Sequence, residues 1–147
     1  MKALLQRVSS AKVEVNGEVV GQIGKGLLVF LCAVRGDREK DLDYVVKKVS
    51  QIRIFEDDEG KMNLAVADVK GSVLVVSQFT LAASTRKGNR PSFDNAEAPK
   101  QAKTMYEDFV RHIRDIGLPV QTGVFAATMD VTLVNDGPVT ILIDSRE

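Results

Sequence analysis

Apolar and polar residues alternate along the first third of the chain, which is the two-residue period of a half-buried β-strand. The alternation predicts strands at Lys2 to Val8, Lys12 to Val15 and Glu18 to Ile23, with Asn16-Gly17 between the last two. Asn-Gly between such segments favours a two-residue hairpin, because both central residues of that turn need a positive φ. An antiparallel hairpin is therefore predicted near the start of the chain.

The run from Leu27 to Val34 is apolar throughout and does not alternate. Such a strand is usually covered on both faces, so we expect it at the centre of a sheet. Between Asp37 and Gln51, apolar residues recur at helical spacing with charged residues between them. This period predicts an amphipathic helix that covers the sheet.

The rest of the chain continues in the same manner. A second amphipathic helix is predicted to begin at Pro99, which suits the first helical turn, and to end before Gly117. Further strands are predicted at Ile52 to Phe55, Val73 to Val76, Val120 to Phe125, Met129 to Val134 and Val139 to Ile143. The order β-β-β-α-β-β-α-β-β-β indicates a mixed α/β fold, in which largely antiparallel sheets form a barrel-like sandwich covered by two helices.

The length and composition of the chain limit the number of domains and the location of the protein. With 147 residues, 44% of them hydrophobic and 27% charged, the chain fits a single globular domain spanning residues 1–147. The N-terminus becomes polar too early for a signal peptide, and no apolar run approaches the roughly 20 residues that span a bilayer. We therefore expect a cytoplasmic protein without membrane contact.

Several kinds of chemistry are disfavoured by the residues present. Twenty basic and twenty acidic side chains give no net charge, so any RNA contact must be local. Cys32 lies in an apolar run and is predicted to be a buried thiol, and His112 is the only histidine. No three-histidine metal site is possible within one chain, and the glycines from Gly21 to Gly26 lack the dinucleotide-binding order. We expect neither a metal nor a cofactor.

Three segments remain as candidates for function. Ser77, Gln78, Phe79 and Thr80 follow an apolar strand, where backbone amides can cradle a carbonyl or merely close a strand exit. Asp136-Gly137 fits a hairpin turn, but Pro138 directly after it cannot donate to a sheet. Between these two segments, the long polar loop from Ala82 to Asn95 carries three cations that suit phosphate oxygens, namely Arg86, Lys87 and Arg90.

Taken together, four separated segments resemble the D-aminoacyl-tRNA deacylase family. They are Ser77-Gln78-Phe79-Thr80-Leu81-Ala82, Arg90-Pro91-Ser92-Phe93, Gly123-Val124-Phe125-Ala126-Ala127-Thr128-Met129 and Leu133-Val134-Asn135-Asp136-Gly137-Pro138-Val139-Thr140. The likeness extends along essentially the whole chain, and the segments occur in the family's order. One departure is Thr128, where many relatives carry an acidic residue.

The resemblance implies a homodimer that acts on aminoacyl-tRNA, with active sites at the subunit interface and no DNA partner. Each site would combine the strand end at Ser77 to Thr80 of one subunit with a Gly137-cis-Pro138 segment of the other. The carbonyls of this segment would exclude an L side chain, and Arg7 would help to hold it. The resemblance also assigns Ala102 and Phe125 to the terminal-adenosine pocket, and Met129 to the vicinity of the aminoacyl group.

The implied activity is hydrolysis of the ester in D-aminoacyl-tRNA and, because glycine is achiral, in glycyl-tRNA. Backbone amides near Gln78 and Thr80 would stabilise the oxyanion, and the ribose 2′-hydroxyl would help to place water. A covalent Thr80 nucleophile is a competing mechanism, although the sequence offers no base beside it. A non-catalytic tRNA-binding module and an L-aminoacyl-tRNA editing domain are the alternative functions.

Overall fold

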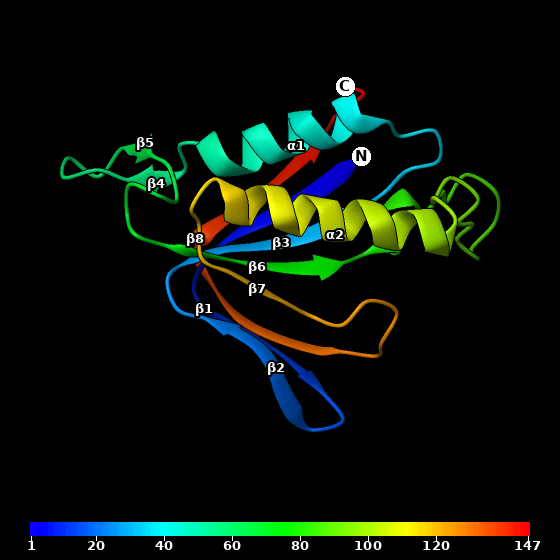
Figure 1. Cartoon of the computed structure of the whole chain (residues 1–147), viewed down its shortest axis with the longest axis horizontal. Coiled ribbons are helices and arrows are strands. Elements are labelled where there is room, and N and C mark those ends of the chain that lie inside the picture. The colour runs from blue at the N-terminus through cyan, green and yellow to red at the C-terminus, as the bar shows by residue number, and fades with distance from the viewer.

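A computed structural model describes residues 1–147 as one long, bent sheet with two helices against one face (Figure 1). The strands of this sheet are β1 (Lys2–Val15), β2 (Glu18–Ile23), β3 (Gly26–Cys32), β6 (Ser72–Ser77), β7 (Val120–Thr122) and β8 (Asp130–Asp144). The helices are α1 (Glu39–Gln51) and α2 (Pro99–Asp115), and a 3-10 turn, η1 (Phe79–Ala82), follows β6. Strands β4 (Phe55–Glu56) and β5 (Met62–Leu64) form a separate small sheet.

Strand order in the main sheet is β2-β1-β3-β6-β7, with β8 paired to β1. The pairs of β1 with β2, β3 and β8 are antiparallel, whereas β6 is parallel to both β3 and β7. The sheet curls until its two ends nearly meet, since a Cβ added at Gly21 of β2 would lie 2.4 Å from the Thr122 carbonyl of β7. The prediction of a mixed, barrel-like α/β fold with two covering helices is confirmed.

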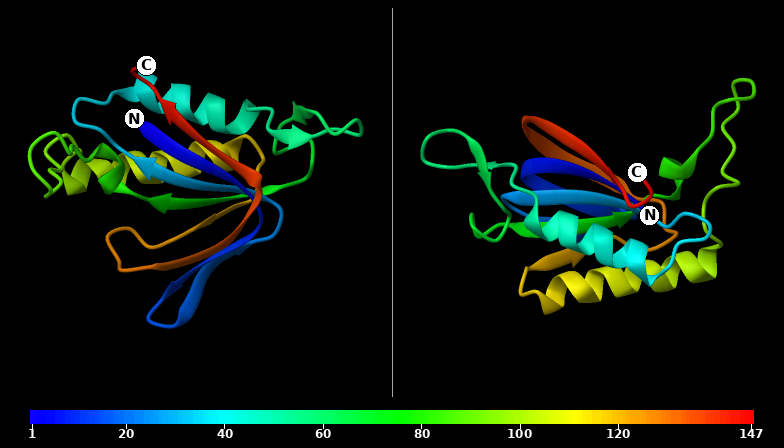
Figure 2. Two further views of the ribbon diagram at one scale, coloured as in Figure 1. Left: turned by 180° about the vertical axis from the view of Figure 1, so that it is seen from behind. Right: turned by 90° about the horizontal axis from the view of Figure 1, so that it is seen from above.

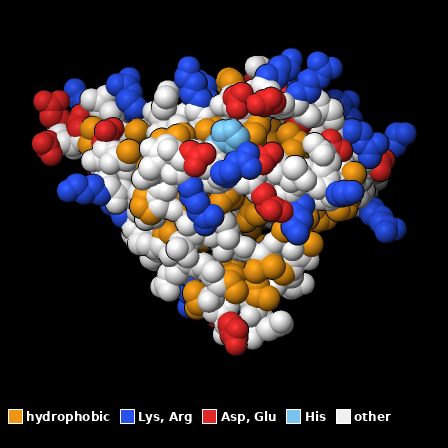
Figure 3. Space-filling model, viewed as in Figure 1, with side chains coloured by type: hydrophobic (Ala, Val, Ile, Leu, Met, Phe, Trp, Pro, Cys, Tyr) orange, Lys and Arg blue, Asp and Glu red, His pale blue; other side chains and the backbone are white.

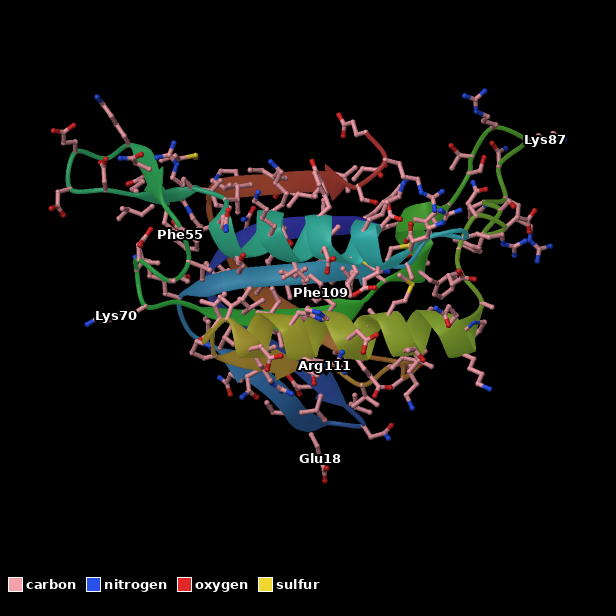
Figure 4. The ribbon with its side chains drawn as sticks, turned by 45° about the horizontal axis from the view of Figure 1, so that its top comes forward. Glu18, Phe55, Lys70, Lys87, Phe109 and Arg111 are labelled. Atoms are coloured by element: carbon pink, nitrogen blue, oxygen red, sulfur yellow. The ribbon has the colours of Figure 1, made fainter.

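Both faces of β3 are buried, as its continuous apolar run predicts. Leu27, Val29 and Leu31 face a large core beneath the two helices, whereas Leu28 belongs to a smaller cluster inside the curled sheet. Phe109 of α2 is fully buried in the larger core, between helix and sheet (Figure 4). The two helices therefore cover one face of the sheet, and the curled strands close over the other face (Figure 2).

Several predicted boundaries are wrong. The two strands expected at Lys2 to Val8 and Lys12 to Val15 are one strand, β1, although Ser9 and Ser10 between them are exposed. The strand expected at Ile52 to Phe55 begins only at Phe55, and β5 was not expected at all. Strand β7 ends at Thr122, three residues earlier than predicted.

The two last strands expected from the sequence are also a single element. Strand β8 runs from Asp130 to Asp144 and stays paired with β1 on both sides of Gly137-Pro138. The hairpin interpretation of Asp136-Gly137 is therefore wrong. The observed order is β-β-β-α-β-β-β-α-β-β, with η1 before α2; relative to the strands predicted from the sequence it gains β5 and loses one strand to each of the fusions in β1 and β8.

Candidate active site

The residues from Ser77 to Thr80 lie where β6 leaves the sheet. Ser77 is the last residue of β6, and Phe79 and Thr80 open the short η1 turn. The first N–H groups of a helical turn have no partner within that turn, so they are available to an acceptor outside it. The backbone here can present amide donors, as a cradle for a carbonyl oxygen requires.

Not every amide in this segment is available. The Gln78 N–H already donates to the Leu31 carbonyl across a distance of 2.8 Å. The Gln78 side-chain amide donates to the Thr80 hydroxyl, and no side chain caps the start of η1. The cradle that the sequence suggested around Gln78, Phe79 and Thr80 therefore depends on the last two amides.

A cavity of about 750 Å³ opens beside this segment, which is within the range of pockets that hold one small ligand. Ser77, Gln78 and Phe79 line it on one side, and Ala102, Phe125 and Met129 line it as well. These six residues come from the segment that joins β6 to η1, from α2 and from the β7–β8 connection, so the fold brings together segments that are far apart in sequence. Apolar side chains are visible in the hollow between α2 and that connection (Figure 3).

The cavity has further lining residues to which the sequence analysis gave no role. Tyr106 is 8% exposed and lies against the cavity, where its ring centroid is 5.8 Å from that of Phe125. Its hydroxyl donates to the Val75 carbonyl at 3.1 Å, and burial raises the Tyr106 pKa above its ordinary value. Phe93, Arg35 and Glu97 also line the cavity, and only Phe93 stands in a motif that the sequence singled out.

The Gly137-Pro138 segment forms a wide bulge in β8. Gln6 pairs with Thr140 and Val8 pairs with Asn135, so residues 136–139 stand opposite Arg7 alone. The Gly137-Pro138 peptide is cis, and Gly137 has a φ of +131°, which a residue with a side chain rarely adopts. Gly137 and Pro138 are both exposed, so their backbone faces outward from this subunit.

Two side chains fix the bulge to its surroundings. The Arg7 side chain, in a residue that is 5% exposed, donates from Nε to the Asp136 carbonyl at 3.1 Å and from a terminal nitrogen to the Ile54 carbonyl at 2.6 Å. The Asn135 amide donates to the Arg7 and Val139 carbonyls, both at 3.0 Å. The contact between Arg7 and this segment, which the resemblance implied, is present.

The bulge and the cavity lie at opposite ends of the sheet. Arg7 pairs with Leu27 and Leu27 with Val73, whereas Ser77 at the cavity pairs with Leu31. Four residues of strand separate these two levels, which is roughly 13 Å along the sheet before any lateral offset. In Figure 1 the middle of β8 lies at the left corner of the sheet and the end of β6 at the right. One subunit therefore does not join the two motifs.

The basic residues lie on the loop that follows η1. Arg86, Lys87 and Arg90 are exposed and form no ion pair. The two ends of the loop are joined by an antiparallel bridge, in which Ser84 and Ser92 exchange backbone hydrogen bonds of 2.8 and 2.9 Å. Lys87 stands far out from the sheet at the tip (Figure 4).

The cysteine and the histidine contribute no catalytic pair. Cys32 is 1% exposed, as predicted, and burial raises its pKa, which keeps the thiol protonated. His112 is partly exposed on α2, and its Nδ1 lies 2.6 Å from the Asp108 carbonyl.

Neither helix combines the length and hydropathy that are needed to cross a membrane.

The similarity to known proteins extends along the whole chain. The family described as D-Tyr-tRNA(Tyr) deacylase matches residues 4–144. The D-aminoacyl-tRNA deacylase of Persephonella marina is 58% identical over 146 residues, which is 99% of each chain. The protein of the same name from Aquifex aeolicus is 56% identical over 147 residues, which is 100% of this chain and 99% of that one.

Two solved structures share the fold. One, named c-Myc DNA Unwinding Element Binding Protein, has a TM-score of 0.93 and 41% identity over 98% of both chains. The other, described as a probable eukaryotic D-amino acid tRNA deacylase, has a TM-score of 0.79 over 97% of this chain and 98% of that one, but only 18% identity, so it supports the fold alone.

These similarities place the chain in a class of hydrolases that act on aminoacyl-tRNA. Within that class it belongs to the D-Tyr-tRNA(Tyr) deacylase family. The resemblance inferred from four motifs is thereby confirmed.

Proposed function

We propose that this protein hydrolyses the ester of D-aminoacyl-tRNA and releases free tRNA and the D-amino acid. The observation that carries the proposal is the cavity of about 750 Å³ beside the start of η1, in a chain whose relatives bear the name D-aminoacyl-tRNA deacylase. Its largely apolar wall, with Ala102, Phe125 and Tyr106, suits a nucleoside base. Phe79, which lines the cavity, and Thr80, the next residue of η1, offer the amides that an ester carbonyl needs.

The chemistry requires little from side chains. A ribose ester is already activated, so a placed water and donors for the developing oxyanion are sufficient. The Phe79 and Thr80 N–H groups provide the donors, and the 2′-hydroxyl of the terminal ribose helps to place the water. Neither a metal nor a cofactor takes part.

Discrimination against L-amino acids depends on Gly137 and Pro138 of a second subunit. The segment is exposed, and Arg7 and Asn135 hold it rigidly on its own subunit, so it can project into a partner. Its carbonyls crowd the position of an L side chain and leave room for a D side chain or for glycine, which is selection by exclusion. The active protein is therefore a homodimer with two sites at its interface, and glycyl-tRNA is a second substrate.

The exposed cations Arg86, Lys87 and Arg90 contact phosphates of the acceptor stem. They form no ion pairs within the chain, so their charge is available to an RNA backbone. Neutralising all three should raise the Kd for tRNA and flatten its dependence on salt. The substrate places the protein in the cytoplasm, where translation takes place.

The direct test is release of labelled amino acid from D-tyrosyl-tRNA and L-tyrosyl-tRNA, with catalytic amounts of protein and a chelator present. Rapid multiple turnover of the D ester alone is expected. Turnover of the L ester alone would indicate an L-aminoacyl-tRNA editing domain. No turnover of either ester, together with tRNA binding, would indicate a non-catalytic binding module.

The role of Thr80 is tested by Thr80→Ala. Its hydroxyl accepts a hydrogen bond from the Gln78 amide, which is not a base, so nothing prepares it as a nucleophile. Since the backbone amide survives the substitution, kcat should fall by less than about tenfold, far short of the loss of a nucleophile. A variant that binds substrate normally but shows no turnover would contradict the amide mechanism.

A further inference from the structure

We infer that Phe79 and Phe93 form a stacking site for the base of the nucleotide that precedes the esterified terminal adenosine. The inference rests on the proposed function, because it assigns a second subsite to the same substrate. The two rings belong to segments separated by the basic loop, and the fold brings them together at the mouth of the cavity.

The rings of Phe79 and Phe93 lie at the rim of the cavity. Both residues line the cavity, yet Phe79 is 55% exposed and Phe93 is 37% exposed. Their centroids are 5.3 Å apart with an interplanar angle of 73°, which is an edge-to-face contact. An edge-to-face pair leaves at least one ring face uncovered by the other ring. Because both rings are also partly exposed, a flat, apolar group that emerges from the cavity can stack on one of them.

The pair is held in place before any ligand arrives. Phe79 is the first residue of η1, directly after the strand residue Ser77 and the hydrogen-bonded Gln78. Phe93 directly follows the Ser84–Ser92 bridge, and its carbonyl accepts a hydrogen bond from the Ala96 N–H at 3.0 Å. The fixed backbone and the contact between the rings limit the conformational freedom that is lost when a ligand binds.

Charge on the same segment identifies the partner as RNA rather than peptide or lipid. Residues 85–91 form the loop, so its tip lies no more than about 14 Å from the Ser84–Ser92 bridge next to Phe93. A chain that leaves the cavity across the rings therefore approaches Arg86, Lys87 and Arg90, which form no ion pairs. Aromatic faces beside free cations match the stacked bases and phosphates of a single strand.

The test compares two esters that differ by one base. Each carries D-tyrosine on a terminal adenosine, preceded either by a cytidine nucleotide or by the same nucleotide without its base. The abasic ester keeps the phosphate, so only stacking distinguishes the pair. The wild-type protein should hydrolyse the cytidine ester with a kcat/KM about 5- to 100-fold higher, mainly through a lower KM.

Variants of single aromatic residues test whether Phe93 causes the preference for the cytidine ester. Phe93→Ala should remove most of the preference for the cytidine ester, and Phe93→Tyr, which keeps a ring, should restore it. Tyr44→Ala is the matched control, because Tyr44 is an aromatic residue that is 40% exposed on α1 and does not line the cavity. It should leave the preference unchanged. Thermal unfolding of each variant verifies that the fold is intact.

Three results would overturn the inference: no preference in the wild-type protein, an equal preference in Phe93→Ala, or a dimer that dissociates in Phe93→Ala, which would make the pair a subunit contact. Failure of the proposed function is a different result, because the wild-type protein would then hydrolyse neither ester.

Discussion

Arg7 brings a positive charge into a position that is only 5% exposed. Burial of a charge is costly unless hydrogen bonds and opposite charges surround it. Arg7 donates to the Asp136 and Ile54 carbonyls, and its Nε lies 3.4 Å from the Asp136 carboxylate. These contacts join the Gly137-Pro138 bulge to the segment before β4. Arg7, whose burial costs free energy, therefore also positions the bulge.

The substitution Arg7→Lys tests this positioning. A lysine ammonium keeps the charge but cannot extend two divergent donors in a fixed plane, so one of the two carbonyls loses its partner. We expect a loss of about 1–3 kcal/mol in the free energy of unfolding and a smaller ratio of D to L hydrolysis. Urea unfolding and paired ester assays measure the two effects. Arg53→Lys, at an exposed arginine that contacts Asn63, should change neither.

Gly123 controls the position of Met129 at the cavity. A Cβ added at Gly123 would lie 2.6 Å from the Met129 sulfur, closer than real Cβ atoms approach a neighbour. Gly123→Ala should therefore displace the flexible Met129 side chain within the cavity and lower kcat/KM by roughly tenfold to a hundredfold, because the bound substrate is misplaced. Gly24→Ala is the control, since an added Cβ there meets nothing within 4 Å. Equal kinetics for the two variants would show that Met129 does not shape the site.

At the scale of elements, the start of α1 is fixed by a carboxylate that titrates. Asp41 accepts the Arg38 N–H at 2.9 Å and the Ser145 hydroxyl at 2.7 Å. Burial acts to raise the pKa of Asp41, but these hydrogen bonds and the nearby N-terminal and Arg146 charges together lower it below the ordinary value. The carboxylate therefore stabilises the fold above the ordinary pKa, and this contribution disappears as the pH falls through the folded pKa.

Asp41→Asn should accordingly destabilise the protein by about 1 kcal/mol at pH 7, because a neutral amide oxygen accepts weaker hydrogen bonds from the Arg38 N–H and the Ser145 hydroxyl than a carboxylate does. The difference from wild type should shrink as the pH falls below the ordinary aspartate pKa of 3.8. Urea unfolding at a series of pH values measures it. Asp43→Asn, an exposed position on the same helix, serves as the control. A difference that stayed constant down to acidic pH would contradict the assigned role of the carboxylate.

The apolar pattern of the sequence predicted some helices and strands correctly and divided others. Period and length predicted both helices and the central strand β3, because burial on one face or on two leaves a clear apolar pattern. Strands β1 and β8 were each divided in two, since exposed Ser9 and Ser10 and the bulge at Gly137-Pro138 interrupt the alternation. Only the register of pairing between the two strands shows that each is continuous.

At the scale of the molecule, the cavity and the bulge occupy opposite ends of the sheet, so a site that contains both needs two copies of the chain. Co-expression of two damaged subunits tests this. Ala102→Phe should fill the cavity of one subunit, and Gly137→Val should disturb the bulge of the other, because a Cβ there would meet Arg7 at 3.0 Å and Val139 at 2.8 Å.

The mixed dimer, isolated through a different tag on each subunit, has one intact site of two, so it should show about half of the wild-type D-ester activity together with the wild-type preference for the D ester. Ala102→Phe alone should be inactive, and Gly137→Val alone should hydrolyse both esters. If the mixed dimer showed no preference for the D ester although both variants were folded, each site would be contained within one subunit.

The sequence by itself determined the fold class, both helices, the central strand, the buried Cys32 and the family, because each depends on local periodicity or on motifs that are read in order. Only the tertiary structure decided that the Gln78 amide is already engaged, that Tyr106 lines the cavity, and that the cavity and the Gly137-Pro138 bulge lie at opposite ends of the sheet. The physical reason is that these are contacts between distant segments, which strand pairing and packing create and which leave no periodic signal along the chain.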